Sequence, residues 1–496
     1  MSRLTSLPDE VIKLIMQHVP PKHRLTSCCL VNRRLHAAAV AATQGLVLGQ
    51  YFFNPTDDDV RVASPEGARS VLEWLDLYGH HLTSLKLQEF PQPLRQLPCT
   101  NLLHLQIDHG CSVQLRPSAD GSPGVLHSVG CSHLTRLDLH WCTVLDATAG
   151  AAVVDSMSSL VNLQHLNWSP EEQCILSAAT LPRLHHLTSL YLRHPSVENL
   201  QQLGGLTSLQ DGCIMFEDDM ALVLGPKRIP GLSFPTTITK LELLAPLEVG
   251  VMPLVPATLQ HFDLFCSFVG NGADEGPGAF LSSMTRLQHL TRLCLFVDPH
   301  RLLGWLVAGP AYSALTASTN LIELSISCTD LPAGIWPFVF PTGHKLPHLT
   351  SLQIQDGELV RDPAPAVWGP AAVASLVSCC PNLCAVEKLY LQRGPHVSEL
   401  QQLTGLTRMS VVIGSLYGDV AAAQQSVKGL AAVTQLQCLH LYLYNPGVSV
   451  AALLPLTSLT ALTKLAFTGR DIDANGGEVP RNDVGLLLAQ VSQISW

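Results

Sequence analysis

One seven-residue phrase recurs along most of this chain, and it limits the possible folds more than any other feature. HLTSLKL at residues 81–87 returns as HLTRLDL at 133–139, HLTSLYL at 186–192, HLTRLCL at 289–295 and HLTSLQI at 348–354. Ten looser copies accompany these five: NLLHLQI (101–107), NLQHLNW (162–168), GLTSLQD (205–211), TITKLEL (237–243), TLQHFDL (258–264), NLIELSI (320–326), AVEKLYL (385–391), GLTRMSV (405–411), LQCLHL (436–441) and ALTKLAF (461–467). Self-similarity at a short period indicates a stacked repeat architecture.

The spacing and pattern of the copies predict a solenoid. Their leading apolar positions run from Leu82 to Leu462, with a mean interval of about 27 residues. In L-x-x-L-x-L the last two apolar residues alternate as in a β-strand that buries one face. A single short strand cannot bury that face alone, so successive repeats must stack in parallel. Helix-compatible runs lie between copies, among them 369–380 and 418–430.

This pattern resembles that of leucine-rich-repeat proteins over about residues 80–470. The resemblance implies an α/β fold: a leucine-rich-repeat solenoid shaped as a horseshoe, with a parallel sheet on its concave side and helices on the convex side. The alternative is a globular α/β protein whose strands happen to begin with leucine. The recurring HLT[SR]L phrase makes that alternative improbable.

A small basic helical unit precedes the repeats. Residues 1–45 carry six basic and two acidic residues, whereas the whole chain has a net charge of −10. Val11, Ile12, Ile15 and Val19 predict the apolar stripe of a first helix, which the Pro20-Pro21 pair ends. A second helix is expected through Leu25, Cys28, Cys29 and Val31, and a third from Asn32 towards Thr43. About forty residues are too few to be stable alone, so this unit should contact a partner or a neighbouring domain.

The same segment resembles the F-box family over about residues 4–44. The match begins with Leu7, Pro8, Glu10, Val11 and Ile12, continues through Ile15, Met16 and Val19, and ends with Leu25, Leu30, Val31, Arg33 and Arg34. Leu35 stands where the family usually has tryptophan, and phenylalanine is commoner than Met16. The resemblance implies docking on the Skp-type adaptor of a cullin–RING ubiquitin ligase through Leu7, Pro8, Glu10, Val11, Ile12, Ile15, Met16, Val19, Leu25, Leu30, Val31, Arg33 and Leu35. The alternative is a helical cap over the first repeat.

Four segments are therefore expected. These are an F-box at 1–45, a linker with an N-terminal capping helix at 46–80, a solenoid of about 15 irregular repeats at 81–470, and a C-terminal cap at 471–496. Within the second segment, residues 64–79 have the composition of a helix.

The concave side of the solenoid is the expected binding surface. Side chains that alternate with the core leucines face that side, and interfaces favour aromatic residues and arginine. The candidates for protein substrate binding are Asp138, His140, Tyr191, Arg193, Phe265, Phe296, Tyr390 and Tyr442. Two groups stand out among them: His140 with Tyr191 and Arg193, and Phe265 with Phe296. The alternative for most of these positions is a solvated polar face.

Recognisable catalytic motifs are missing from the sequence. It contains no H-E-x-x-H, C-x-x-C, G-x-S-x-G or G-x-x-x-x-G-K-[ST], so we expect no catalytic residue, metal ligand or cofactor.

No basic stripe for nucleic acid accompanies the repeats. The first residues lack a secretory signal, so the fifteen cysteines are interpreted as reduced thiols. The charge-free stretches 37–56, 302–322 and 363–386 are not interpreted as membrane spans. We expect a cytoplasmic or nuclear protein, or alternatively a cytoskeletal or axonemal one.

Together these features predict a non-catalytic adaptor. The resemblance implies the substrate-recognition subunit of an SKP–cullin–F-box ubiquitin ligase, with ubiquitin transfer carried out by partner subunits. The alternative function is a leucine-rich-repeat scaffold, unrelated to ubiquitin, that binds a cytoskeletal or axonemal assembly. Capture of the Skp-type adaptor by the N-terminal residues separates the two.

Overall fold

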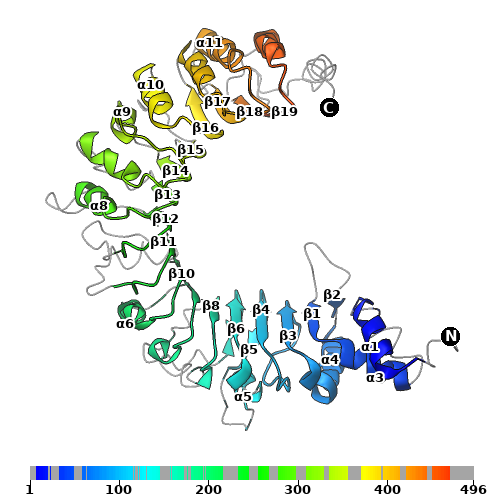
Figure 1. Ribbon diagram of the computed structural model, residues 1–496. Helices are drawn as coiled ribbons and strands as arrows, with labels where there is room; N and C mark the ends of the chain where they lie inside the picture. The colour runs from blue at the N-terminus through cyan, green and yellow to red at the C-terminus, as the bar shows by residue number, and fades with distance from the viewer. Residues whose placement is uncertain are drawn as a thin grey trace, which may run out of the picture. The chain divides into compact units, whose positions relative to one another are not determined.

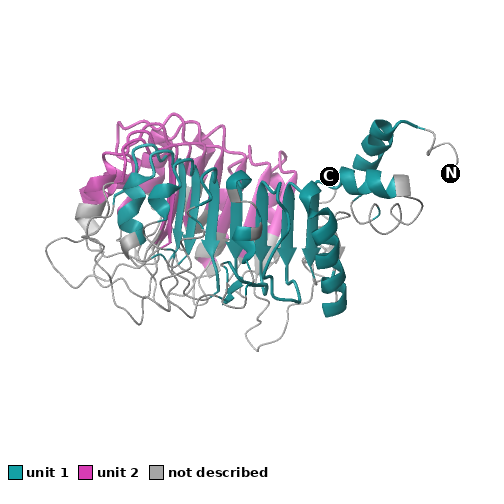
Figure 2. Ribbon diagram, turned by 90° about the horizontal axis from the view of Figure 1, so that it is seen from below, with its two compact units in different colours: residues 1–220, 229–238 teal, residues 221–228, 239–496 magenta. Residues whose placement is uncertain are grey.

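The chain forms two compact units, coloured separately in Figure 2: residues 1–220 with 229–238, and residues 221–228 with 239–496. A computed structural model describes residues 7–20, 23, 33–49, 59–62, 64–115, 117, 121, 123–129, 131–145, 157, 159–171, 176, 180–193, 195, 197–215, 233–244, 255–266, 277–297, 309–328, 334–355, 370–391, 395–413, 420–443 and 450–469. The expected C-terminal cap and the expected second helix of the F-box lie outside these residues.

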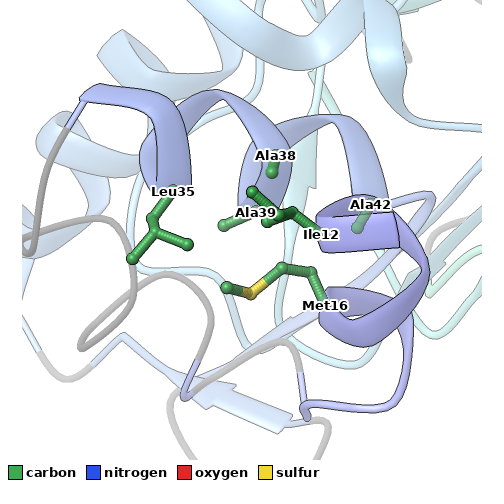
Figure 3. Packing of buried hydrophobic residues seen from close by; sticks show 6 residues of the cluster. All are labelled: Ile12, Met16, Leu35, Ala38, Ala39 and Ala42. Atoms are coloured by element: carbon green, nitrogen blue, oxygen red, sulfur yellow. The ribbon is translucent and has the colours of Figure 1, made fainter. Parts of the chain in front are cut away.

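The first unit opens with two packed helices, α1 (Asp9–Gln17) and α3 (Arg33–Ala42), which we call the head. Asp9 and Glu10 occupy the first turn of α1, where carboxylates are favoured by the helix dipole. Ile12 and Met16 of α1 point towards Leu35 and the alanines of α3 (Figure 3), and all are buried. Because alanine side chains are small, the two helices can approach closely.

This packing corrects the apolar stripe predicted for the first helix. Ile12 and Met16, four residues apart, form the buried side of α1. Val11 is 41% exposed, although the sequence grouped it with Ile12. The stripe predicted from apolar positions alone therefore mixed two sides of the helix.

A parallel sheet follows the head directly. Its strands in the first unit are β1 (Gly45–Gly49), β2 (Asp59–Arg61), β3 (Ser84–Gln88), β4 (His104–Asp108), β6 (Arg136–His140), β8 (His165–Ser169), β9 (Ser189–Arg193) and β10 (Asp211–Met215). β1 pairs with β2 on one side and β3 on the other, and each later strand pairs with the next in this series. β5 (Ser112–Val113) and β7 (Thr143–Val144) form a separate small parallel pair.

Helices and short turns connect the strands of the first unit. They are α4 (Pro65–Tyr78), η3 (Gly79–His81), α5 (Val125–Ser128), η4 (Cys131–His133), η7 (Leu181–Arg183), α6 (Val197–Gln202) and η8 (Leu203–Gly205). The leucines of the phrase face this layer and are fully buried, for example Leu82, Leu85 and Leu87. The alternation of buried and half-buried residues along β3 is the one predicted from the sequence.

The second unit repeats the same arrangement. Its strands, each parallel to the next (Figure 1), are β11 (Lys240–Leu244), β12 (His261–Cys266), β13 (Arg292–Val297), β14 (Glu323–Cys328), β15 (Ser351–Gln355), β16 (Ala385–Leu391), β17 (Arg408–Ile413), β18 (Cys438–Leu443) and β19 (Lys464–Gly469). Its helices are α8 (Pro277–Met284), η11 (Gly309–Thr316), α9 (Trp336–Val339), α10 (Pro370–Cys379), η12 (Pro395–Gln402), α11 (Val420–Leu430) and η13 (Val450–Ser458). The predicted α/β leucine-rich-repeat solenoid is confirmed.

The threonine of the recurring phrase has a structural role. Its hydroxyl donates to a backbone carbonyl of the preceding repeat, as Thr83 does to Gln44 and Thr135 to Leu103. The same bond recurs from Thr188, Thr291, Thr350, Thr407 and Thr463, at 3.0 to 3.5 Å. The phrase therefore combines core leucines with a side chain that ties each strand to the one before it.

Two predicted copies have a different register in the structure. Asp211 pairs with Ser189, so Leu209 takes the leading position that GLTSLQD assigned to Leu206. Leu206 instead caps the short helix η8. In β16, Ala385 pairs with Ser351, and an irregularity follows between Val386 and Leu389. The leucine spacing within these two copies looks the same with or without the short helix or the irregularity. The sequence pattern alone therefore could not locate either feature.

The expected linker at 46–80 contains more structure than predicted. β1 and β2 belong to the parallel sheet, which therefore begins before residue 81. The helix predicted at 64–79 is present as α4. Ser64 caps it by accepting a 3.1 Å hydrogen bond from the backbone N–H of Gly67.

Replacing Ser64 by alanine should lower the free energy of unfolding by about 1 kcal/mol, because α4 loses this cap. Urea denaturation followed by circular dichroism measures the change. Ser70→Ala, at an exposed position within α4, is the matched control and should not destabilise. Equal stability of the Ser64 variant and the wild type would show that the cap contributes nothing.

Candidate functional site: a docking head and the open face of the sheet

The outer side of α1 presents an exposed apolar surface. Val11 is 41% exposed and Leu14 is 61% exposed. They are three positions apart (i, i+3), so they lie on one side of the helix, and half-buried Ile15 is next to them. We call Val11, Leu14 and Ile15 the docking face. The sequence analysis did not include Leu14, although its i, i+3 spacing from Val11 could have identified it.

The residues expected to contact an adaptor divide into two groups. Pro8, Glu10 and Val11 are exposed, and Leu7, Ile15 and Val19 are half-buried. In contrast, Ile12, Met16 and Leu35 are at most 6% exposed because they form the core of the head. A direct contact from these three is therefore not available in the folded head, and they support the docking face from beneath. Outside the described residues are Leu25, Leu30 and Val31, together with the side chain of Arg33.

The head is joined closely to the start of the sheet. Thr43 and Gln44 alone separate α3 from β1, and the Thr43 hydroxyl donates to the Ala39 carbonyl at 2.8 Å. His36 of α3 lies 3.1 Å from the Tyr78 hydroxyl of α4, and their rings meet edge to face. The Gln44 carbonyl accepts hydrogen bonds from the backbone of Thr83 and Ser84.

The open face of the sheet in the first unit is mostly polar and internally paired. We define it by the matched positions on the side opposite the buried leucines: Lys86, Gln106, Asp138, Asn167 and Tyr191, and Gln88, Asp108, His140, Ser169 and Arg193. Lys86 and Gln106 contact one carboxylate oxygen of Asp108 at 3.1 and 2.7 Å. Arg136 pairs with Asp138 at 2.7 Å.

An aromatic cluster lies at the carboxyl ends of these strands. The guanidinium carbon of Arg193 lies 3.4 Å from the centre of the Trp141 ring, a cation–π contact. His140 meets the rings of His109 and Trp141 edge to face. Burial is the main influence on His140 and lowers its pKa, while Asp108 opposes this effect. The imidazole is therefore neutral at pH 7.

Trp141 joins two of the predicted substrate-binding residues and was not itself predicted. It is 38% exposed and has a φ of 51°, which is rare for a bulky residue. His140 and Arg193 both contact it. Tyr191 instead hydrogen-bonds to the sulfur of Met215 at 3.4 Å, and Asp138 is only 5% exposed. The sequence analysis missed Trp141 because it lies two residues beyond the repeat phrase, outside the positions that alternate with the core leucines.

The remaining candidates belong to the second unit. Phe265 and Phe296 are register partners in β12 and β13. Phe296 is half-buried, whereas the side chains of Phe265 and Tyr390 lie outside the described residues. Tyr442 stacks on His440, with ring centres 4.2 Å apart.

The buried cysteines among the described residues are typical of structural thiols. Cys99 and Cys111 are fully buried, and burial raises the pKa of each to about 12. Such thiols stay protonated and unreactive at neutral pH. Over the described ranges, no group of three or more histidine, cysteine, aspartate or glutamate side chains could hold a metal ion.

Comparison with known proteins identifies the N-terminal segment. Residues 4–40 match the F-box domain model. No curated protein sequence matches the chain. One similar solved structure is a leucine-rich-repeat protein of Leptospira interrogans, 14% identical, with 93% of this chain and 91% of that chain covered at a TM-score of 0.39. In the part of the chain that the structure describes, no helix has the length and apolar character needed to cross a membrane.

Proposed function

We propose that this chain is the substrate-recognition subunit of a cullin–RING ubiquitin ligase. Its head would dock on a Skp-type adaptor, and its repeats would bind a protein substrate for ubiquitination. The observation that supports this most directly is the docking face. Within a segment that matches the F-box model, Val11 and Leu14 are exposed while Ile12 and Met16 are buried.

The physical argument concerns the cost of exposed apolar groups. Leu14 is 61% exposed on its helix. Burial of its apolar surface against a partner would be favourable by about 25 cal/mol per Å². Lys13 is an exposed cation on the same helix, and its charge would steer an acidic partner towards the head.

The proposed contribution to ubiquitination is proximity. Binding of adaptor and substrate to one chain places a substrate lysine near the ubiquitin-loaded enzyme, which replaces a bimolecular encounter by an intramolecular one. The short connection from α3 to β1 and the His36–Tyr78 contact support this role. They restrict how far the head can move away from the first strands.

The double variant Val11→Glu/Leu14→Glu should bind the adaptor at least about thirtyfold more weakly, because buried apolar anchors contribute 2 kcal/mol or more to such interfaces. Isothermal titration calorimetry of the full chain with purified adaptor measures the affinity. Leu77→Glu is the matched control, since Leu77 is 65% exposed and belongs to α4 instead of α1. It should leave the affinity unchanged.

Two other outcomes would decide against the proposal. If the wild-type chain does not bind the adaptor, the scaffold function is favoured over the ligase function. If the double variant binds as tightly as wild type, adaptor binding does not use the docking face.

A further inference from the structure

A cavity of about 320 Å³ lies at the carboxyl ends of β3 and β4. Residues 89–93, Gly110 and Ser112 line it. Glu89 is the only one of these residues with an ionisable side chain, and Gln92 and Ser112 add polar groups. The volume is at the lower end of the range for sites that hold small groups. The lining therefore suits a cationic hydrogen-bond donor.

The backbone around the cavity holds Glu89 in an unusual conformation. Glu89 has a φ of 48° and Gly110 a φ of 67°, both in the left-handed region. A non-glycine residue there costs of order 1 kcal/mol or more and is often found at functional sites. The N–H of Glu89 donates to the His109 carbonyl at 2.8 Å, and the N–H of Gly110 donates to the Trp141 carbonyl at 3.1 Å. The second bond places the backbone of Trp141 next to Gly110, which lines the cavity.

Trp141 supplies an exposed aromatic group at this edge. Its ring already holds one cation, the guanidinium of Arg193, at 3.4 Å. Its own φ is 51°. Trp141 and Glu89 are the two non-glycine residues with a positive φ among the described residues. Glu89 follows β3 and Trp141 follows β6, so both lie at the carboxyl-end edge of the sheet, with the end of β4 between them.

Asp108 lies at the same end of β4 but does not line the cavity. It is the last residue of β4 and is 5% exposed, and Lys86 and Gln106 contact its Oδ2. Its Oδ1 is buried and has no hydrogen-bond partner among the residues that the structure describes. A buried acceptor without a donor is unfavourable by about 1–3 kcal/mol. Lys86, the nearby cation, is already engaged by Asp108.

We propose that the carboxyl ends of β3, β4 and β6 form a subsite for a basic side chain, lysine or arginine, of the bound protein. Glu89 is the charge partner in the cavity, and Trp141 flanks the bound group. The inference rests on the proposed function, because it names the chemical class of substrate that the repeats select. Basic segments of a substrate are then recognised at this edge of the first unit.

The test uses the full chain with its tryptophans replaced by 5-fluorotryptophan and followed by ¹⁹F NMR. Trp141→Phe identifies the Trp141 resonance. N-acetyl-arginine methylamide and N-acetyl-lysine methylamide should each shift that resonance saturably. The uncharged isostere, N-acetyl-citrulline methylamide, should bind at least fivefold more weakly. Glu89→Gln should weaken arginine binding at least fivefold, because it removes the charge and keeps the side-chain shape and backbone.

Glu73→Gln, at an exposed position of α4, is the charge-matched control and should leave probe binding unchanged. Equal affinity for arginine and citrulline probes, an unshifted Trp141 resonance, or wild-type affinity in Glu89→Gln would each overturn the inference. Adaptor affinity, measured on the same samples, reports separately on the ligase function. If the chain binds the arginine probe but not the adaptor, the subsite is supported and only the proposed ligase function is contradicted.

Discussion

Replacing Ile12 by alanine should unfold the head and abolish adaptor binding while the repeats stay folded. Ile12 is fully buried between α1 and α3, in a core whose other members are Met16, Leu35 and alanines. Removing a buried isoleucine side chain costs about 2–5 kcal/mol. A unit of about forty residues has little stability to lose. Hydrogen exchange of the α1 and α3 amides, together with calorimetric titration of the adaptor, measures both effects.

Val11→Ala is the control for this prediction. Val11 adjoins Ile12 in the sequence but is 41% exposed, so its truncation should leave hydrogen exchange in the head nearly unchanged. Its effect on adaptor binding should be direct and smaller than that of the double glutamate variant. Unaltered protection of α1 and α3 in Ile12→Ala would mean that the core in Figure 3 does not hold the head together.

Replacing Trp168 by alanine should destabilise the first unit by about 3–5 kcal/mol, the usual cost of truncating a buried tryptophan. Trp168 is 1% exposed on β8, and it stands at a leucine position of the repeat. Each repeat contacts only its neighbours, so the loss of hydrogen-exchange protection should be centred on β6, β8 and β9. Urea denaturation measures the total change, and residue-resolved hydrogen exchange measures its spread.

The matched control is Val161→Ala, a few residues before β8. Val161 is 50% exposed, and surface substitutions of this kind change stability by about 0.5 kcal/mol or less. A Trp168→Ala chain with wild-type stability would contradict the assignment of Trp168 to the core. Protection lost equally over the whole chain would instead show that the repeats unfold as one cooperative block.

The local sequence pattern was sufficient to predict strands and helices wherever a residue's position depends only on its own repeat. The strands began at the expected place in all but two copies, and α4, α10 and α11 formed where the composition predicted helices. Each copy carries the same leucine spacing, so the same alternation is repeated many times. The exceptions involve η8 before β10 and the irregularity in β16. Both depend on how a strand pairs with its neighbour.

The candidate sites were predicted less completely than the fold. The sequence analysis placed Ile12, Met16 and Leu35 on the adaptor surface, and the structure buries all three. It omitted Leu14, Trp141 and Glu89. Apolar character marks a residue as suitable for either a core or an interface, so it cannot distinguish them. The residue type did not predict the positive φ of Trp141 and Glu89.

The amino-acid sequence by itself determined the parallel repeat fold and the presence of a helical unit before it, because periodic leucines can bury their side chains only by stacking. Tertiary structure alone decided which side of α1 faces water and which side chains meet at the ends of β3, β4 and β6. These contacts join residues from different helices and repeats, and packing between elements sets them.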